Sequence, residues 1–301
     1  MRLVTYDRLG IRRLGALVED TVVDLQDAVG HPAFPATMEA LVTNNGGTLL
    51  DAARDALAQP DAARECAVPG ARLLIPLIPS SLREFVPAAL GPNAGRSGDG
   101  RRGGAGADGH RSLLGPGDVV RWPTTARYLG CELEVACIVG RRGRRLSRAA
   151  AAHAIFGYTL MGDWSAWEAP RAGESGRTRA PSEFAVSLGP CVVTPDEFDP
   201  SGVRLVARIA EEIWSEGSLD TTGPSFPEII AEVSRTEEVV PGEVYGSAAF
   251  GFGYRVDPGK ALRRGTTVEL EAEGIGVLRN RVSTRRATPR AHRSRTSEPV
   301  R

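Results

Sequence analysis

The sequence predicts an α+β protein dominated by a rolled, mixed β-sheet, and three observations lead to that fold class. Short apolar stretches bounded by glycine, proline and polar residues recur along most of the chain, as is typical of strands. Helical patterns are confined to short segments near residues 36–58, 148–155 and 227–235. The 301 residues can bury a substantial core, either as one large domain or as a small domain followed by a larger one.

Local signals set the limits of several elements. Ser147 precedes an alanine-rich run and is a typical helix N-cap, and Pro227 suits the first turn of the third helix. Residues 91–112 have almost no apolar content, which predicts a mobile loop. Residues 215–226 indicate a connecting loop, and the polar, arginine-rich residues 284–301 indicate a disordered tail.

Composition excludes several classes of partner. Lys and Arg together number 37 and Asp and Glu together number 37, so the chain is formally neutral, which argues against a nucleic-acid or anionic-membrane partner. The four cysteines show no C-x-x-C spacing, and we expect buried thiols in a reducing compartment. Neither a signal peptide nor an apolar run of membrane-spanning length is indicated, so we expect a soluble, cytoplasmic protein.

One apolar strand carries two carboxylates. In Cys131–Val139, alternation places Glu132 and Glu134 on the face opposite Cys131, with the two carboxylates roughly 6.5 to 7 Å apart. Asp163 follows about thirty residues later, in Gly-Asp-Trp-Ser. Two like charges this close are protonated, are solvated on an exposed face, or are neutralised by a hard cation bound through oxygen.

The order of these segments resembles the fumarylacetoacetate hydrolase family. The resemblance covers about residues 1–282 and rests on the Glu-x-Glu strand, the Asp-x-Ser segment that follows it, and further matching segments, namely Leu73–Phe85, Phe184–Thr194, Val240–Val244 and Val268–Val282. It implies the family's β-roll or sandwich fold, with a strand-rich N-terminal module at residues 1–75, a catalytic module at 76–283 and a tail at 284–301. It also implies a homodimer.

The resemblance implies a metal site with four ligands. Family members hold Mg²⁺, Mn²⁺ or Ca²⁺ on an acidic residue ahead of the strand, on the Glu-x-Glu and on the later Asp. Here those positions are Glu84, Glu132, Glu134 and Asp163, with Glu84 standing where the family usually has Asp. We expect Mg²⁺ or Mn²⁺, with Ca²⁺ as an alternative. An exposed loop carboxylate is the other interpretation of Glu84.

The family's water-activating groups are poorly matched. The catalytic histidine falls on Gly91, and the histidine that could reach the site instead is His110, in the predicted loop. A loop there is either a lid over the site or an insertion without a role. The family lysine falls on Ser182, and the nearest cations are Arg177 and Arg179.

The substrate-binding positions also differ from the family. The family has an Arg and then a Gln after its Asp-x-Ser segment, where this chain has Trp167 and Pro170, and the family's Thr-Gly-Thr turn falls on residues 247–249, which begin with Ser247. The candidates for substrate binding are therefore Trp167, Arg179 and Ser247, and each is alternatively an ordinary packing or surface residue. Trp167 in place of Arg suits a less charged, more apolar substrate.

Three functional hypotheses follow. Loss of the general base alone commonly costs ~10²- to 10⁴-fold in rate, so ordinary hydrolysis is disfavoured. The first hypothesis is a divalent-metal enzyme acting on an enolisable 1,3-dicarbonyl or 2-oxo acid without hydrolysis, by decarboxylation, tautomerisation, dehydration or cyclisation, in a secondary-metabolic role. The second is a non-catalytic binding or scaffold protein. The third is a carbon–carbon bond hydrolase that uses His110.

Overall fold

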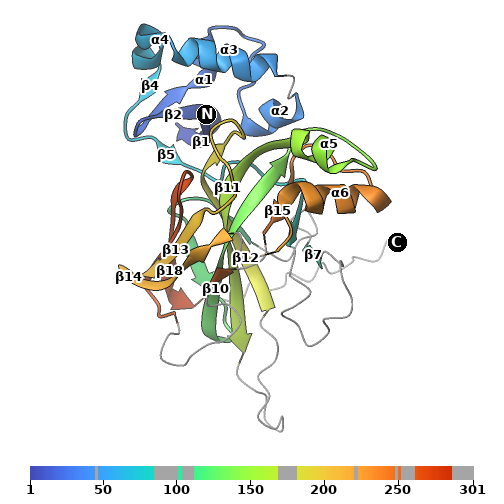
Figure 1. Ribbon diagram of the computed structural model, residues 1–301. Coiled ribbons are helices and arrows are strands. Elements are labelled where there is room, and N and C mark those ends of the chain that lie inside the picture. The colour runs from blue at the N-terminus through green and yellow to red at the C-terminus, as the bar shows by residue number, and fades with distance from the viewer. Residues whose placement is uncertain are drawn as a thin grey trace, which may run out of the picture.

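The computed structural model describes residues 1–44, 47–84, 101–103, 112–168, 182–219, 223–247, 250–251 and 262–286. The protein has the predicted α+β architecture, with two sheets and a few short helices (Figure 1). No helix within these ranges is long and apolar enough to cross a membrane.

The larger sheet combines strands from both halves of the chain. Its strands are β1 (Arg2–Arg8), β2 (Ile11–Val18), β3 (Thr21–Asp24), β4 (Ala67–Val68), β5 (Arg72–Leu73), β6 (Ser81–Glu84), β7 (Arg101–Gly103), β8 (Ser112–Leu114), β10 (Ala126–Val139), β11 (Ile155–Glu168), β12 (Ser182–Val193), β15 (Glu243–Gly246) and β16 (Phe250–Gly251). Their order is β4-β3-β2-β1-β12-β11-β10-β15-β6-β7, with β5, β8 and β16 paired to β1, β12 and β10. The sheet is mixed, because β6 runs parallel to β15 and β8 runs parallel to β12.

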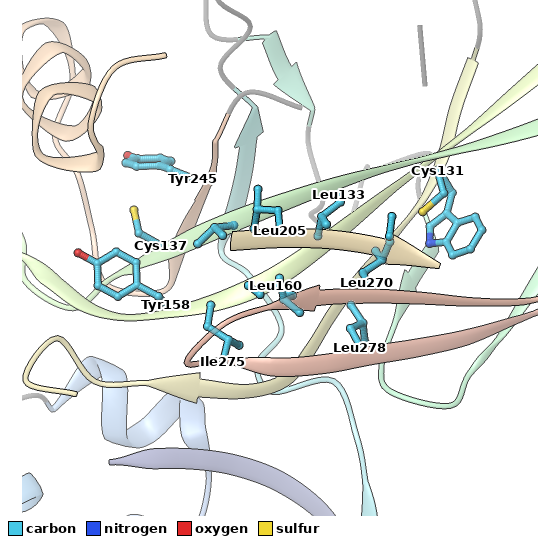
Figure 2. Packing of buried hydrophobic residues seen from close by; sticks show 14 of the residues in the cluster. Cys131, Leu133, Cys137, Tyr158, Leu160, Leu205, Tyr245, Leu270, Ile275 and Leu278 are labelled. Atoms are coloured by element: carbon cyan, nitrogen blue, oxygen red, sulfur yellow. The ribbon is translucent and has the colours of Figure 1, made fainter. Parts of the chain in front are cut away.

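A second sheet covers one face of the first. It is formed by β9 (Val119–Trp122), β13 (Arg204–Ile209), β14 (Glu212–Ser218), β17 (Thr267–Ala272) and β18 (Gly276–Arg286), in the order β14-β13-β17-β18-β9. Figure 2 shows Leu205, Leu270 and Leu278 of this sheet packed in one cluster with Cys131, Leu133 and Leu160 of the larger sheet. The space between the sheets is therefore a dry apolar core.

Strand β10 is buried on both faces, and its alternation divides the interior in two. Cys131, Leu133, Val135 and Cys137 belong to the cluster beneath the second sheet, and we call this side the Cys131 face. Ala136 and Ile138 belong to a second cluster that extends into the N-terminal strands and helices. Glu132 and Glu134 share the side of Ala136, which we call the carboxylate face.

Helices occur where the sequence predicts them, with two additions. They are α1 (Leu25–Val29), α2 (Met38–Thr43), α3 (Thr48–Leu57), α4 (Pro60–Glu65), α5 (Arg148–His153) and α6 (Phe226–Thr236). The Ser147 hydroxyl caps α5 by accepting a hydrogen bond from the Ala150 backbone N–H, and Pro227 lies in the first turn of α6, as predicted. The segments of α1 and α4 were not predicted, because helices this short carry little periodic signal.

The N-terminal strands continue the larger sheet. Strand β1 pairs with β12 through Leu3 opposite Val192, and Figure 1 shows β1–β5 and α1–α4 gathered at one end of the molecule. Apolar residues of this part share a buried cluster with β10 and β11. The boundary between residues 75 and 76 stays a prediction.

A buried charged network fixes these strands to one another. Asp24, only 1 % exposed, accepts hydrogen bonds from the Tyr6 hydroxyl at 2.5 Å and from the Arg13 guanidinium at 2.7 and 2.8 Å. The backbone N–H of Asp27 donates to the same carboxylate at 2.9 Å, so Asp24 also caps α1. Burial, together with the Asp24 carboxylate, raises the pKa of Tyr6 to about 12.

Three loop predictions need correction. Strand β7 lies inside the predicted loop 91–112, most of which is outside the described residues. Strand β14 occupies the first part of the predicted connection 215–226, because Ser215–Ser218 pair with β13. Strand β18 continues to Arg286, beyond the predicted start of the tail, and residues 287–301 lie outside the described residues.

Candidate metal centre

Two predicted ligands stand opposite each other on neighbouring strands. In the antiparallel pairing of β10 with β11, Glu132 is the direct partner of Asp163, and Glu134 follows one pleat along, opposite Met161. Direct partners in such a pair have Cβ atoms about 4.5–5.5 Å apart on the same face. The register therefore gathers three carboxylates on the carboxylate face.

A glycine clears space for Glu134. A Cβ added to Gly246 of β15 would lie 2.3 Å from Glu134 Oε2 and 2.4 Å from Met161 Cε. Glu134 is 2 % exposed and Asp163 is 4 % exposed. The interpretation of the Glu132 and Glu134 face as an exposed strand surface is therefore wrong for Glu134, and Glu132 is half-buried.

Glu84 reaches the same face from the other side. Strand β6 runs parallel to β15 with Glu84 beside Gly246, and Leu82, two residues earlier, lies in the apolar cluster that adjoins the carboxylate face. Arg83 points the opposite way and forms a bidentate ion pair with Glu237 at 2.6 and 2.9 Å. Glu84 is half-buried, so the interpretation of this residue as an exposed loop carboxylate is also wrong.

The electrostatics support this grouping. Burial, followed by the charge of Glu84, raises the pKa of Glu132 to about 7. Burial raises the pKa of the Cys131 thiol, and the charges of Asp163, Glu132 and Glu134 add to that increase. The charge of Glu84 is therefore felt at Glu132, and the charges of Asp163, Glu132 and Glu134 are all felt at the Cys131 thiol.

The carboxylates of the four predicted ligands do not converge on one point. Within the described part of the chain, no three His, Cys, Asp or Glu side chains come close enough together to hold a metal ion. The donor chemistry nevertheless fits a hard divalent cation, which prefers carboxylate oxygens. The backbone positions fit as well, because the carboxylates share one face and Gly246 leaves room beside Glu134. Binding would thus require new side-chain rotamers rather than a new backbone.

The other predicted site residues fall in different places. Trp167 lies on the carboxylate face of β11, two pleats beyond Asp163 and opposite Tyr128. His110 and Arg179 lie outside the described residues. Ser247 follows β15, and its buried hydroxyl accepts a hydrogen bond from the Val135 backbone N–H at 3.3 Å.

Two hollows in the described structure lie away from the carboxylates. One of about 140 Å³ is lined by Ser247, Leu219 and Phe226, and the last two belong to the apolar cluster of the Cys131 face. The other, of about 590 Å³, lies between α5 and α6. Neither is lined by a predicted metal ligand, so the contact of Ser247 with a substrate stays a prediction.

Sequence reasoning missed two features of this face. Ser165 lies between Asp163 and Trp167 on β11 and is buried. It is the serine of the Asp-x-Ser segment, to which the sequence analysis assigned no role. Gly246 makes room for Glu134, and a single glycine at a strand end carries no signal of such a contact. Alternation along β11 could have found Ser165.

Comparison with known proteins decides the family. The profile of the fumarylacetoacetate (FAA) hydrolase C-terminal domain matches residues 107–283, more than half of the chain. The chain belongs to the fumarylacetoacetate hydrolase family. The predicted resemblance is thereby confirmed.

Curated relatives cover only part of the chain. A mitochondrial oxaloacetate tautomerase of Homo sapiens is 29% identical over 175 residues, which are 57% of this chain and 56% of that protein. An uncharacterised protein of Pyrococcus abyssi is 29% identical over 176 residues, which are 57% of this chain and 75% of that protein. The chain thus spans little more than half the length of the tautomerase.

Solved structures of the family share the fold over nearly the whole chain. Maleylpyruvate hydrolase from Sphingobium, in complex with manganese(II) and pyruvate, aligns with a TM-score of 0.70 and 21% identity over 94% of this chain and 99% of that one. A 2-hydroxyhepta-2,4-diene-1,7-dioate isomerase from Mycobacterium marinum aligns with a TM-score of 0.64 and 19% identity over 94% and 98%. At these identities the likeness shows the fold, including the strand-rich N-terminal part.

Proposed function

We propose that this protein is a divalent-metal-dependent enzyme that acts on an enolisable 1,3-dicarbonyl or 2-oxo acid without hydrolysing it. The observation that carries the proposal is the opposition of Glu132 and Asp163 on adjacent strands, with buried Glu134 on the same face. A hard divalent cation bound through oxygen offsets the free-energy cost of desolvating several carboxylates in a partly dry site. Mg²⁺ or Mn²⁺ is the proposed counter-charge, and Ca²⁺ is an alternative.

The proposed ligands are Glu84, Glu132, Glu134 and Asp163. When bound, the metal would supply Lewis-acid polarisation of adjacent carbonyl oxygens, which favours the enol or enolate form. The protein residues would hold the chelating end of the substrate against the carboxylate face and limit access of water. Trp167, Arg179 and Ser247 are the proposed substrate-binding residues.

A reaction without activated water suits this chain better than hydrolysis. The position of the family's catalytic histidine is Gly91, and the proposed substitute is His110. The relatives named as a tautomerase and an isomerase catalyse reactions that need no water as a nucleophile, and they support this choice. We therefore propose tautomerisation or isomerisation as the reaction, in preference to decarboxylation, dehydration and cyclisation.

The first test is Mn²⁺ binding followed by electron paramagnetic resonance. We expect saturable binding by the native protein, at least 10-fold weaker binding by Glu134→Ala because a buried ligand is lost, and native binding by Glu212→Ala, an exposed carboxylate on β14. Absence of saturable binding by the native protein would overturn the proposal.

The second test separates the reactions. Proton NMR of oxaloacetate and of 2,4-dioxo acids in D₂O with the Mn²⁺-loaded protein should show faster exchange of the C3 hydrogens than the Glu134→Ala variant gives, with no cleavage products. Cleavage that is lost in His110→Ala would instead establish the hydrolase hypothesis.

The lack of convergence of the carboxylates favours one alternative, a non-catalytic binding protein of this fold. That protein would show neither Mn²⁺ binding nor accelerated exchange. The same two measurements therefore distinguish it from the enzyme.

A further inference from the structure

The hollow of about 590 Å³ between α5 and α6 has features of a binding site of its own. Figure 1 shows these two helices side by side, and they pack against each other. Small-molecule sites usually occupy roughly 300–1,000 Å³, so the volume suits a metabolite. Three arginines stand in the lining, namely Arg145, Arg148 and Arg235.

The loop that carries Arg145 is fixed against α6 by its backbone. The Arg145 N–H donates to the carbonyl of buried Ser234 at 2.6 Å, and the Leu146 N–H donates to the Ser234 hydroxyl at 2.9 Å. Gly143 and Val239 exchange two hydrogen bonds at 2.9 and 3.0 Å. These contacts hold Arg145 at a φ of +52°, a left-handed conformation that is unfavourable for a residue with a Cβ. Arg145 is therefore kept in the lining by a rigid backbone, against its own conformational preference.

The arginines of the lining are only weakly engaged by carboxylates. Arg148 pairs with Glu228 at 3.1 Å, and Arg235 pairs with Glu232 at 2.9 Å, and all four side chains are exposed. Exposed pairs contribute little, because water screens both charges. Arg145 forms no ion pair with any residue of the described ranges. All three guanidinium groups are therefore available to an anion that enters the hollow.

Three guanidinium groups in one hollow favour a phosphate as that anion. A carboxylate offers two oxygens to one bidentate partner, whereas a phosphate monoester offers three acceptor oxygens and about two negative charges at neutral pH. Residues 141–148 contain five arginines and no Asp or Glu, so the potential along this loop is positive although the whole chain is neutral. The expected ligand therefore carries a phosphate.

The remaining lining residues indicate the group that bears the phosphate. Glu228 and Glu232 can accept hydrogen bonds from hydroxyl groups and would repel further negative charge, which disfavours a nucleic-acid strand or an anionic membrane. Leu146 and Ala231 offer apolar contacts to the C–H groups of a ring. The described lining holds no aromatic side chain on which a nucleobase could stack. A sugar phosphate fits this set of residues better than a nucleotide.

We propose that the hollow between α5 and α6 binds a sugar phosphate, with Arg145, Arg148 and Arg235 on the phosphate and Glu228 and Glu232 on the hydroxyl groups. No residue of the lining is a proposed metal ligand, so this inference does not depend on the proposed function.

Isothermal titration calorimetry of the full chain at physiological salt tests the site. The probes are glucose 6-phosphate and ribose 5-phosphate, and inorganic phosphate and AMP are the comparison ligands. We expect saturable binding of at least one sugar phosphate with a Kd below about 1 mM, and at least ~10-fold weaker binding of both comparison ligands.

Two substitutions assign the binding to the hollow, and each has a matched control. Arg145→Gly removes the guanidinium and suits the φ of +52°, so it should weaken sugar phosphate binding at least ~10-fold without lowering the midpoint of urea denaturation. Glu19→Gly makes the same backbone change at a φ of +53° and should bind natively. Arg235→Ala should also weaken binding at least ~10-fold. Its control is Arg64→Ala, which removes an exposed pair of the same i,i+3 spacing in the last turn of α4.

Each outcome decides the inference. Absence of saturable binding of both sugar phosphates would overturn it, and so would native binding by Arg145→Gly and Arg235→Ala. Equal affinity for inorganic phosphate, or tighter binding of AMP, would overturn the assignment to a sugar phosphate. The urea midpoint shows that each variant is folded. Mn²⁺ binding, measured on the same variants, should stay native and reports separately on the metal-centred function.

Discussion

Two groups of buried carboxylates in this protein have opposite electrostatics. Burial acts to raise the pKa of Asp24, but hydrogen bonds from Arg13 and Tyr6 outweigh it, and the pKa is lowered. At Glu132, burial and the charge of Glu84 act in the same direction and raise the pKa to about 7. The Asp24 carboxylate is stabilised by partners within the chain, whereas ionisation of Glu132 is disfavoured in the folded protein. The second pattern is typical of a site that awaits a ligand.

The largest expected effect tests the structural network. Asp24→Ala should lower the free energy of unfolding by about 3–5 kcal/mol, because it leaves the Arg13 guanidinium without its buried partner. Urea denaturation at pH 7 measures this, with exposed Asp20→Ala as the control. A loss below about 1 kcal/mol would show that the ion pair of Asp24 with Arg13 contributes no more to stability than an exposed ion pair does.

The same variant has a defined pH dependence. The pKa of Asp24 is lower in the folded protein than in the unfolded chain, so the unfolded state binds more protons in acid. The contribution of Asp24 to stability is therefore present above the unfolded pKa of about 4 and is lost as the pH falls through the folded value. The difference between native protein and variant should shrink in acid.

The next largest effect tests the proposed site. In Gly246→Ala, the new Cβ would lie 2.3 Å from Glu134 Oε2, so the carboxylate must move. We expect Mn²⁺ affinity to fall at least ~10-fold, and stability to fall by about 1–3 kcal/mol through overpacking. Gly47→Ala, whose Cβ meets nothing within 4 Å, is the control. Native Mn²⁺ affinity in Gly246→Ala would mean that the Glu134 position is not used.

The sequence predicted the site better than it predicted the network. Alternation along β10 correctly placed Glu132 and Glu134 on one face, because a regular strand carries its side-chain direction in its spacing. Burial of that face could not be predicted, since it depends on the packing of distant N-terminal elements against it. The Asp24 network was also missed. It joins β1, β2 and β3, and pairing of this kind leaves no local pattern.

A smaller effect with the opposite sign is expected at Glu132. Glu132→Gln should raise the free energy of unfolding of the metal-free protein by about 1–2 kcal/mol at pH 8, because it removes a carboxylate whose ionisation is disfavoured. The raised pKa means that the folded protein keeps the proton between about pH 4.5 and 7. Native stability thus falls across that window as pH rises. The gain from Gln should vanish near pH 4.5.

Urea denaturation of both proteins at pH 5 and pH 8 in EDTA measures this difference. The matched variant is Asp24→Asn, because neutralising the Asp24 carboxylate should destabilise the protein. An equal loss of stability in Glu132→Gln and Asp24→Asn would remove the distinction between the two groups.

The smallest effect concerns Ser247, which joins the site to the core. Its hydroxyl accepts a hydrogen bond from the Val135 N–H, so Ser247→Ala should lower the free energy of unfolding by about 0.5–1.5 kcal/mol and leave Mn²⁺ affinity native. Thermal denaturation and Mn²⁺ titration of one sample measure both. The same hydroxyl can still donate its proton, so a parallel fall in the binding of a 2,4-dioxo acid would support the proposed contact of Ser247 with the substrate. Unchanged stability would show that the hydrogen bond between Val135 and Ser247 contributes nothing measurable to the free energy of unfolding, unlike the hydrogen bonds of the Asp24 network.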